Sequence, residues 1–536
     1  MSLESLKKIT KILRTKREFF LLAGIMLLGL ALRLINIGTE PYWADELLSL
    51  EAARHYLGDP VGLWHYLQIA EVHPPLYYYL IQGWGSLFGF GEAAIRSLSL
   101  IFSLGLIALT YWAGLVFFKS KKIGLLSAFV AAILPMQIEF GQEARPYALY
   151  CFFGILSLIL LAKYFQENKT NKRVWLLLGF IACSIVGLYL HYSYALILVP
   201  LVFFWLIRTI IKKDGREFVW WLATMAVIFV GFYFWLPALL FKTFFINEIK
   251  TALTRSSYYS RPFSFFEDAF NELIWASKER PSIAEIIGAA LVKIMLAILI
   301  LSAVKNQYGW IKKQQNNLIY LGAILGLSIL MFLGMPSSTN YTNLIYKHIL
   351  FDTVILALLI AVILRQLNNS RWQIFCLILI LVSLMTFQIK IVSDDSLYDF
   401  NHRFKLVVDH INEHYQESDL LLTYTVPVRP QSNYYLRSDV PGFIGVFPTD
   451  ILIEDFMATR ETLGVMENES QLRFSLINWP GLDKKLNYLI KKNQAKRVWV
   501  IGDGATQQIR EWFVFNGWKI AFEPIGSLFP LTLYVK

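Results

Sequence analysis

The spacing of apolar residues predicts a bundle of membrane-spanning helices. A helix needs about 20 consecutive apolar residues to cross the hydrocarbon core of a bilayer. Windows that reach or approach this length recur about eleven times before residue 391. The first is too long, and too soon followed by others, for a cleaved signal peptide. The windows are 19–37, 95–118, 123–138, 147–164, 174–190, 193–212, 218–241, 284–304, 317–335, 346–364 and 372–390.

The pattern changes after residue 390. Residues 404–415 have helical periodicity, whereas 420–424, 498–501 and 531–535 are short apolar runs typical of strands. We therefore expect two domains. One is a transmembrane domain over residues 1–390, in which residues 38–94 form a long first loop, and the other is a small α/β domain over residues 391–536.

Composition agrees with this division. The chain has 536 residues, of which 56% are hydrophobic and 17% charged. Soluble domains are about 45–50% apolar and about 25% charged, so a water-soluble globule and a disordered chain are both excluded. The three cysteines all lie in apolar windows and form no disulfide framework.

The net charge of +11 is explained by topology. Lysine and arginine gather in the N-terminal tail and in alternate turns, at 119–122, 169–173, 212–216, 312–313 and 365–371. Cytoplasmic loops carry such an excess of basic residues. We therefore expect a multi-pass plasma-membrane protein with a cytoplasmic N-terminus, with the loop 38–94 and the domain 391–536 external. Nucleic acid is not expected as a partner, whereas membrane lipids are.

Two adjacent acids, Asp45 and Glu46, lie shortly after the first window. A carboxylate at the headgroup level is placed to act as a general base on a membrane-bound substrate. Asp45 also precedes an apolar helical run, so it is compatible with a helix N-cap as well, a position that favours acids. The sequence leaves both interpretations open.

Several basic residues lie on the same predicted external side. His73 stands at a corner made by Pro74 and Pro75, where it is either an ordinary loop residue or a phosphate ligand. Arg145 precedes Pro146 in a short turn with Glu143, so it either pairs with that acid or directs its guanidinium to a phosphate. Arg33 and Arg96 lie at the outer ends of apolar windows, where a charge needs a partner or a cavity.

Together these segments resemble the GT-C fold membrane glycosyltransferases. The similarity is to the protein O-mannosyltransferases, the aminoarabinose transferases and the RgtA/B/C/D-like lipopolysaccharide-core transferases, and by motif it covers residues 20–240. It implies a polytopic α-helical membrane protein of GT-C type with a small extracytoplasmic C-terminal α/β domain. The segments are Arg33, Trp43-Ala44-Asp45-Glu46, His73-Pro74-Pro75-Leu76, Arg96 and Glu143-Ala144-Arg145-Pro146-Tyr147.

The resemblance also implies an activity. Such enzymes move a hexose or pentose from a polyprenyl-phosphate donor to a lipid, glycan or protein acceptor on the external face, with inversion at the anomeric carbon. Asp45 then matches the general base and Glu46 a helper or alternative base. The family often has lysine at the position of His73 and Arg-Tyr in place of Tyr346-Lys347. The implied substrate-binding positions are Arg33, His73, Arg96, Glu143, Arg145, Tyr147 and Lys347.

The chemistry of such a transfer suits these residues. The acceptor hydroxyl needs a base, and the departing phosphate needs positive charge. We expect no cofactor and no metal, because the sequence has no His/Cys cluster and too few acids in any one turn.

Two other classes of function are less well supported by the sequence. A transporter or flippase of lipid-linked sugars is expected to have broken helices, charges at the bilayer midplane and often inverted repeats. No repeat is evident, and most of the unusual charge is external. An interaction protein whose spans serve only as an anchor does not need so many of them.

Overall fold

The computed structural model describes most of the first 242 residues and parts of the remainder. The described residues are 3–242 except 70 and 72, then 309–331, 348, 350–366, 371 and 375, and finally 395–423, 435–436, 440, 444–445, 482–501, 506–522 and 531–536. The chain divides into two compact units. The first comprises residues 1–38, 56–240 and 258–393, and the second 39–55, 241–257 and 394–536. The segment that carries Asp45 and Glu46 therefore belongs to the second unit, unlike in the predicted division at residue 391.

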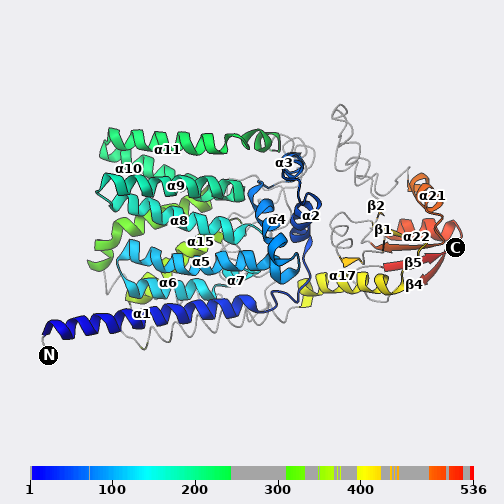
Figure 1. The fold of residues 1–536 in the computed structure, drawn as a ribbon, viewed down its shortest axis with the longest axis horizontal. Helices are drawn as coiled ribbons and strands as arrows, with labels where there is room; N and C mark the ends of the chain where they lie inside the picture. Colours follow the sequence, from blue (N-terminus) through cyan, green and yellow to red (C-terminus); the bar gives the residue numbers. More distant parts are fainter. Residues whose placement is uncertain are drawn as a thin grey trace, which may run out of the picture. The chain divides into compact units, whose positions relative to one another are not determined.

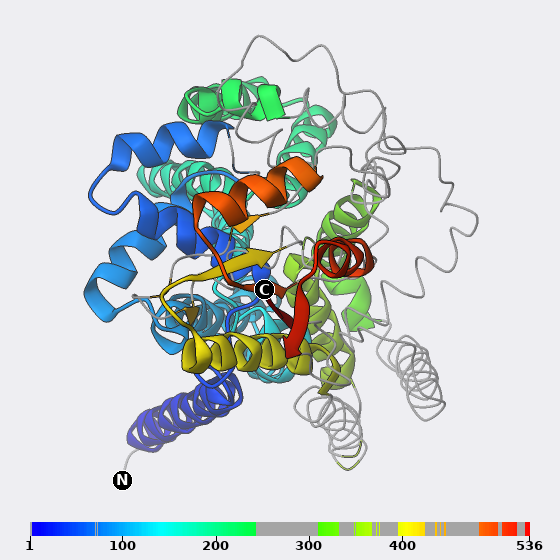
Figure 2. The ribbon, with the colours of Figure 1, turned by 90° about the vertical axis from the view of Figure 1, so that its right-hand side faces the viewer.

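The first unit is helical. Its long helices run side by side in Figure 1 and are seen nearly end-on in Figure 2. Helix α5 packs against α6 and α8, and α15 packs against α6 and α8. The helices are α1 (Leu3–Leu34), α3 (Pro60–Ile69), α4 (Leu76–Phe88), α5 (Glu92–Phe118), α6 (Lys121–Ile133), α7 (Pro135–Glu139), α8 (Tyr147–Gln166), α9 (Thr170–Leu190), the 3-10 helix η1 (Tyr192–Tyr194), α10 (Ala195–Lys212), α11 (Gly215–Tyr233) and α15 (Leu350–Gln366). Residues 309–331 are also helical.

Five helical segments are long and apolar enough to cross a membrane: Glu92–Phe118, Tyr147–Gln166, Thr170–Leu190, Tyr192–Lys212 and Gly215–Tyr233. They confirm five of the predicted windows. The window 123–138 is not one continuous helix, since α6 ends at Ile133 and α7 begins at Pro135, whose missing N–H cannot continue the helix. The window 284–304 and nearly all of 372–390 lie outside the described residues, so a total of eleven spans stays a prediction.

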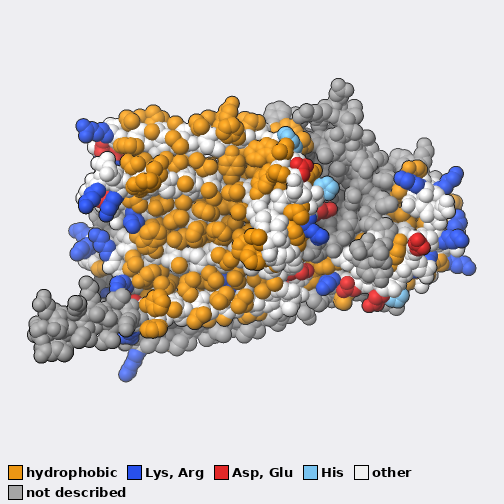
Figure 3. Space-filling view, viewed as in Figure 1, with side chains coloured by type: hydrophobic (Ala, Val, Ile, Leu, Met, Phe, Trp, Pro, Cys, Tyr) orange, Lys and Arg blue, Asp and Glu red, His pale blue; other side chains and the backbone are white. Residues whose placement is uncertain are grey.

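The surface of these helices has a wide apolar band, and basic side chains gather at one end of it (Figure 3). Turns that are distant in sequence meet at this end because consecutive helices run antiparallel. Their exposed lysines and arginines include Lys121, Lys172, Lys213 and Arg216. We call this end of the first unit the basic end, and the other the opposite end.

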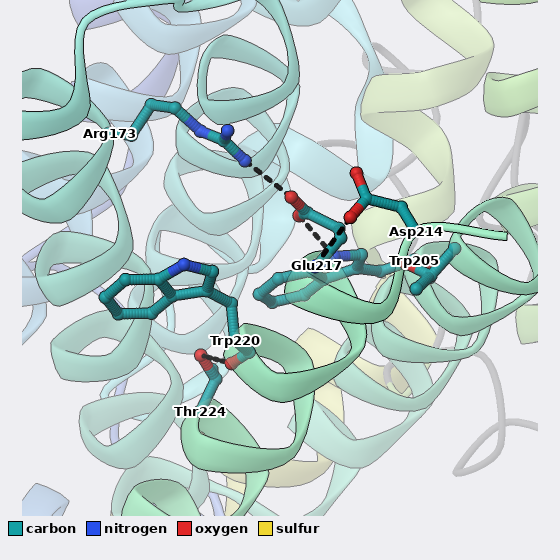
Figure 4. Close-up of polar contacts among 7 residues, drawn as sticks. Arg173, Trp205, Asp214, Glu217, Trp220 and Thr224 are labelled. Carbon is teal, nitrogen blue, oxygen red and sulfur yellow. Dashed lines mark hydrogen bonds and ion pairs between the residues drawn. The ribbon is translucent and has the colours of Figure 1, made fainter. Parts of the chain in front are cut away.

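A buried carboxylate joins three helices at the basic end (Figure 4). Glu217 of α11 accepts hydrogen bonds from Arg173 of α9, at 2.6 Å, and from Trp205 of α10, at 2.9 Å. Its backbone N–H in turn donates to Asp214, the N-cap of α11, at 3.1 Å. A carboxylate that is 6% exposed needs such partners, so the cluster holds the ends of α9, α10 and α11 together.

Close packing elsewhere depends on small residues. A Cβ added to Gly114 of α5 would lie 2.5 Å from the Cα of Gly124 in α6. Only glycine lets the two backbones approach this closely, as is common between membrane helices.

The second unit contains a five-stranded sheet in the order β2-β1-β3-β5-β4. The pairs β1–β2 and β1–β3 are parallel, and β5 is antiparallel to β3 and β4. The strands predicted at 420–424, 498–501 and 531–535 are confirmed within one residue. The strands are β1 (Asp419–Thr423), β2 (Ile444–Gly445), β3 (Arg497–Ile501), β4 (Lys519–Phe522) and β5 (Leu531–Val535), and the helices of this unit are α2 (Ala44–His55), α17 (Asp395–His414), α21 (Leu482–Lys492) and α22 (Thr506–Phe515).

Apolar side chains pack on both faces of this sheet. On one face Trp499 and Leu421 pack with residues of α17, and on the other Val498 and Val500 pack with residues of α21 and α22. Alternate residues of a strand point to opposite faces, which is why β3 contributes to both clusters.

Candidate functional site

An arginine and a histidine from separate loops meet at the opposite end of the first unit. His73 precedes the buried Pro74 and Pro75, after which α4 begins. Arg145 lies in the turn between α7 and α8 and is 3% exposed, with its carbonyl accepting a hydrogen bond from Ser99 of α5. One guanidinium nitrogen of Arg145, Nη2, lies 2.7 Å from His73 Nε2. The structure thus brings together two of the predicted phosphate ligands.

This contact determines the protonation state of His73. Arginine has five N–H donors and no acceptor, so His73 Nε2 must accept the hydrogen bond. An imidazole that accepts at Nε2 is neutral and carries its proton on Nδ1.

Two further histidines, His191 and His348, stand beside this pair. The ring of His191, at the end of α9, lies 4.8 Å from that of His73 and 5.4 Å from that of His348. It also stacks on Tyr150 of α8 at 5.2 Å. Ser193 of η1 connects the group, because its Oγ lies 2.6 Å from His348 Nδ1 and its backbone N–H donates to His191 Nδ1 at 3.0 Å. We call His73, His191 and His348 the histidine cluster.

The sequence prediction did not include His191. The sequence nonetheless contains an indication of it, because His191 follows directly after the span that ends at Leu190 and so lies at the predicted external end. Only the fold shows that this turn lies beside His73, more than a hundred residues away in the chain.

Tyr147 and Glu143 flank the same turn. Tyr147 is fully buried at the start of α8, 5.5 Å from the ring of His191, and the Arg145 guanidinium lies 5.9 Å from its ring centre. Glu143 is half-buried, and its backbone carbonyl accepts a hydrogen bond from the Arg145 N–H at 2.8 Å. Both residues stand in the segment that holds Arg145.

Arg33 has a different environment from the one predicted. It is fully buried, and its Nε–H donates to Ser103 Oγ at 2.7 Å. Its remaining N–H groups donate to backbone carbonyls of the end of α6, of α7 and of α1, namely those of Ala131, Ala132, Gln137 and Gly29. All five N–H donors of the guanidinium are thus engaged within the protein. Arg33 therefore joins helix ends, and no N–H remains for direct contact with a phosphate.

Arg96 and Lys347 complete the predicted basic residues. Arg96 of α5 is 5% exposed and donates from Nη1 to the carbonyl of Ile37, just after α1, at 3.1 Å. This contact holds the start of the first loop against the helices. Lys347 lies outside the described residues.

Asp45 and Glu46 differ in their surroundings although they are neighbours in α2. Helix α2 begins at Ala44, so both acids lie in its first turn. Glu46 is 1% exposed and accepts the backbone N–H of Trp43 at 3.1 Å, as the glutamate of a capping box does. Asp45 is half-buried and does not occupy the N-cap position. Asp45 is therefore not the N-cap of α2, and Glu46 supplies the hydrogen bond that the glutamate of a capping box makes.

Among the residues that the structure describes, no group of three or more histidine, cysteine and acidic side chains is arranged to hold a metal ion. The expectation of no cofactor stays a prediction.

The site lies in the part of the chain that matches a known family. Residues 72–237 match the model of the dolichyl-phosphate-mannose-protein mannosyltransferases. This range contains His73, Arg96, Arg145 and His191, but not Asp45 and Glu46.

Solved structures show the fold. The chain aligns over 96% of its length with the apo structure of ArnT from Cupriavidus metallidurans, covering 97% of that chain, at 12% identity and a TM-score of 0.61. ArnT from the same organism bound to undecaprenyl phosphate aligns over the same shares at 13% identity, with a TM-score of 0.57. The chain has the GT-C fold.

The oligosaccharyltransferase of Archaeoglobus fulgidus, solved with zinc and sulfate, also aligns with this GT-C chain. It aligns at 13% identity and a TM-score of 0.50, over 90% of this chain and 67% of that one. No curated protein matches the sequence. The resemblance predicted from the motifs is confirmed, and this GT-C protein is a multi-pass membrane protein. Identities of 12–13% establish the fold.

Proposed function

We propose that the chain is an inverting glycosyltransferase that takes a sugar from a polyprenyl phosphate and passes it to an acceptor on the external face of the membrane. The observation that carries this proposal is the buried Arg145 in contact with His73. A buried guanidinium beside a neutral imidazole is suited to bind an anion such as the phosphate of a lipid. The ArnT relative solved with undecaprenyl phosphate supports the same class of donor.

Arg145, with His73 beside it, is the proposed anchor for the donor phosphate. Its N–H groups stabilise the charge that develops on the phosphate as the bond to the anomeric carbon breaks. Arg96 supports this site by holding the start of the first loop.

Asp45 is the proposed general base. It removes the proton of the acceptor hydroxyl, so that the oxygen attacks the anomeric carbon opposite the departing phosphate and inverts its configuration. Glu46 is less suited to this role, because it is almost fully buried and already accepts the Trp43 N–H.

The proposed orientation follows from the basic end of the first unit. If that end faces the cytoplasm, then the histidine cluster lies at the external face. The proposal keeps eleven spans, an external C-terminal α/β domain, and a lipid, glycan or protein acceptor.

The test is to incubate membranes that contain the protein with a panel of hexose and pentose polyprenyl phosphates and to measure release of polyprenyl phosphate. We expect release from at least one donor. Release should fall at least tenfold in Arg145→Ala, whereas Arg216→Ala, which removes an exposed arginine at the basic end, should match the wild type. Sugar lipid that crosses the membrane without being cleaved would instead identify a flippase.

A further inference from the structure

His191 occupies a position where a small polar side chain would be sufficient to cap η1. His191 is the N-cap of η1, and its Nδ1 accepts the Ser193 N–H at 3.0 Å. Serine, asparagine and aspartate are the usual residues for that role. An imidazole adds a flat ring, and this ring lies between those of His73, Tyr150 and His348. The ring of His191 therefore makes contacts that the capping of η1 does not require.

The hydrogen bonds assign different proton positions to His191 and His73. Because the Ser193 N–H donates to Nδ1, His191 is held neutral with its proton on Nε2. Protonation of His191 would break this bond to the backbone. His73 Nε2 instead accepts its hydrogen bond from the side chain of Arg145, whose N–H groups are equally suited to donate to a phosphate.

We propose that the Arg145–His73 contact is a switch that couples binding of the donor phosphate to uptake of one proton. The inference deepens the proposed function and rests on it, since its ligand is a polyprenyl phosphate. Arg145 is held by His73 while the site is free of phosphate, and it turns to the phosphate when the lipid arrives. Nε2 of His73 is then free to bind a proton, and the site gains a second positive charge.

The Arg145 N–H···His73 Nε2 hydrogen bond breaks, and an Arg145 N–H···phosphate oxygen bond forms. A proton from solvent forms an N–H bond at His73 Nε2. The neutral His191 ring, 4.8 Å away, offers a polarisable face to the new imidazolium. The positive charge gained at His73 offsets the negative charge that sugar transfer adds to the lipid. The donor is a phosphodiester with one negative charge, whereas the released lipid is a phosphomonoester with nearly two.

The surroundings of His73 decide where the proton goes. The neighbouring elements contribute acids, phenols and bases. Among them, the His73 imidazole is the group that gains an available lone pair when Arg145 turns to the phosphate. These titratable and charged side chains come from the turn before α8, from α8 itself, from the end of α9 and from the residues just before α15: Glu143, Arg145, Tyr147, Tyr150, His191 and His348.

Titration calorimetry in two buffers of different ionisation heat measures proton uptake on binding. The full chain in lipid nanodiscs is titrated with a polyprenyl phosphate and with its methyl diester at about pH 7.5, where free imidazole is mostly neutral. We expect the wild type to take up between about 0.5 and 1 proton with either lipid, because both offer a phosphate oxygen to Arg145. The methyl diester decides the test, because it has the single charge of the donor and, unlike the monoester, cannot exchange a proton of its own. In His73→Gln the amide oxygen still accepts from Arg145 but cannot bind a proton, so binding should persist with uptake reduced at least twofold.

Two further variants separate the roles. His191→Asn keeps the cap of η1 and removes the ring, so it should bind the lipid with reduced uptake. His65→Gln changes an exposed histidine of α3 and should match the wild type. Lipid binding by the wild type without proton uptake, or equal uptake by the wild type and His73→Gln, would overturn the switch and leave the proposed function standing. Binding of neither lipid would overturn both.

Discussion

The two acids of α2 allow catalysis and folding to be separated by single substitutions. Asp45→Asn removes the carboxylate but leaves the backbone carbonyl of Asp45, which accepts the Ser49 hydroxyl, unchanged. Loss of a charge in the first turn of a helix costs about 0.3–1 kcal/mol of stability. If Asp45 is the base, the rate falls by about 10²–10⁴, which corresponds to about 3–5 kcal/mol in activation free energy.

Substitutions of Glu46 should act in the opposite way. Glu46→Ala removes the acceptor of the Trp43 N–H, and loss of such a cap costs about 0.5–2 kcal/mol. Glu46→Gln keeps an acceptor oxygen at the same place, as capping boxes with glutamine do. We therefore expect reduced stability in Glu46→Ala, near wild-type stability in Glu46→Gln, and activity per folded molecule within a few-fold of wild type in Glu46→Gln.

The assay measures both quantities on the same preparations. Turnover is followed as release of polyprenyl phosphate from the donor that the panel identifies, and stability as the thermal unfolding midpoint in nanodiscs. Turnover of Asp45→Asn within a few-fold of wild type would refute Asp45 as the base. A loss in Glu46→Gln as large as that in Asp45→Asn would move the role to Glu46.

The remaining predictions concern binding, packing, pH and topology. Arg145→Gln should weaken donor binding by about 1.5–3 kcal/mol in equilibrium titration, because it removes charge-assisted contacts; unchanged affinity would place Arg145 outside the donor site. Arg33→Lys offers three N–H donors where five are used, so the unfolding midpoint should fall clearly, whereas donor affinity in the folded protein should not; a selective loss of donor affinity would contradict this. Burial and then the nearby His414 lower the pKa of His410 in α17, so folding favours its neutral form. The second unit should lose stability as the pH falls through the ordinary histidine range, at about pH 6.5, seen as faster hydrogen exchange in α17, and His410→Gln should flatten this pH dependence. A reporter fused after Lys536 should be active only outside the cytoplasm, and activity inside it would reverse the proposed topology.

Local pattern was enough to identify several elements from the sequence. Apolar windows predict individual spans because a helix in lipid satisfies its own backbone hydrogen bonds, so its position depends on its own residues. The same holds for β3 and β5, which are short apolar runs. Proline at positions 74 and 146 correctly marked the corners beside His73 and Arg145, because proline acts on its immediate neighbours.

The partners of buried polar groups were decided only by the tertiary structure. Arg33 seemed from sequence to be a ligand for phosphate, yet the ends of α6 and α7 supply the carbonyls that take its donors. Asp45 lies inside α2 rather than at its N-cap, and Glu46 accepts the Trp43 N–H, both of which depend on where the helix begins.

His191 joined the site because α9 ends beside the loop of His73. Its neighbours in the chain do not reveal this contact, because a side-chain pair separated by more than a hundred residues depends on how the helices pack. Sequence determined which segments are helices and where charge is placed along them. Which of those charges bind each other, and which are left to bind a substrate, was determined by helix packing, because a buried charge must find its partner among whatever groups the fold brings near it.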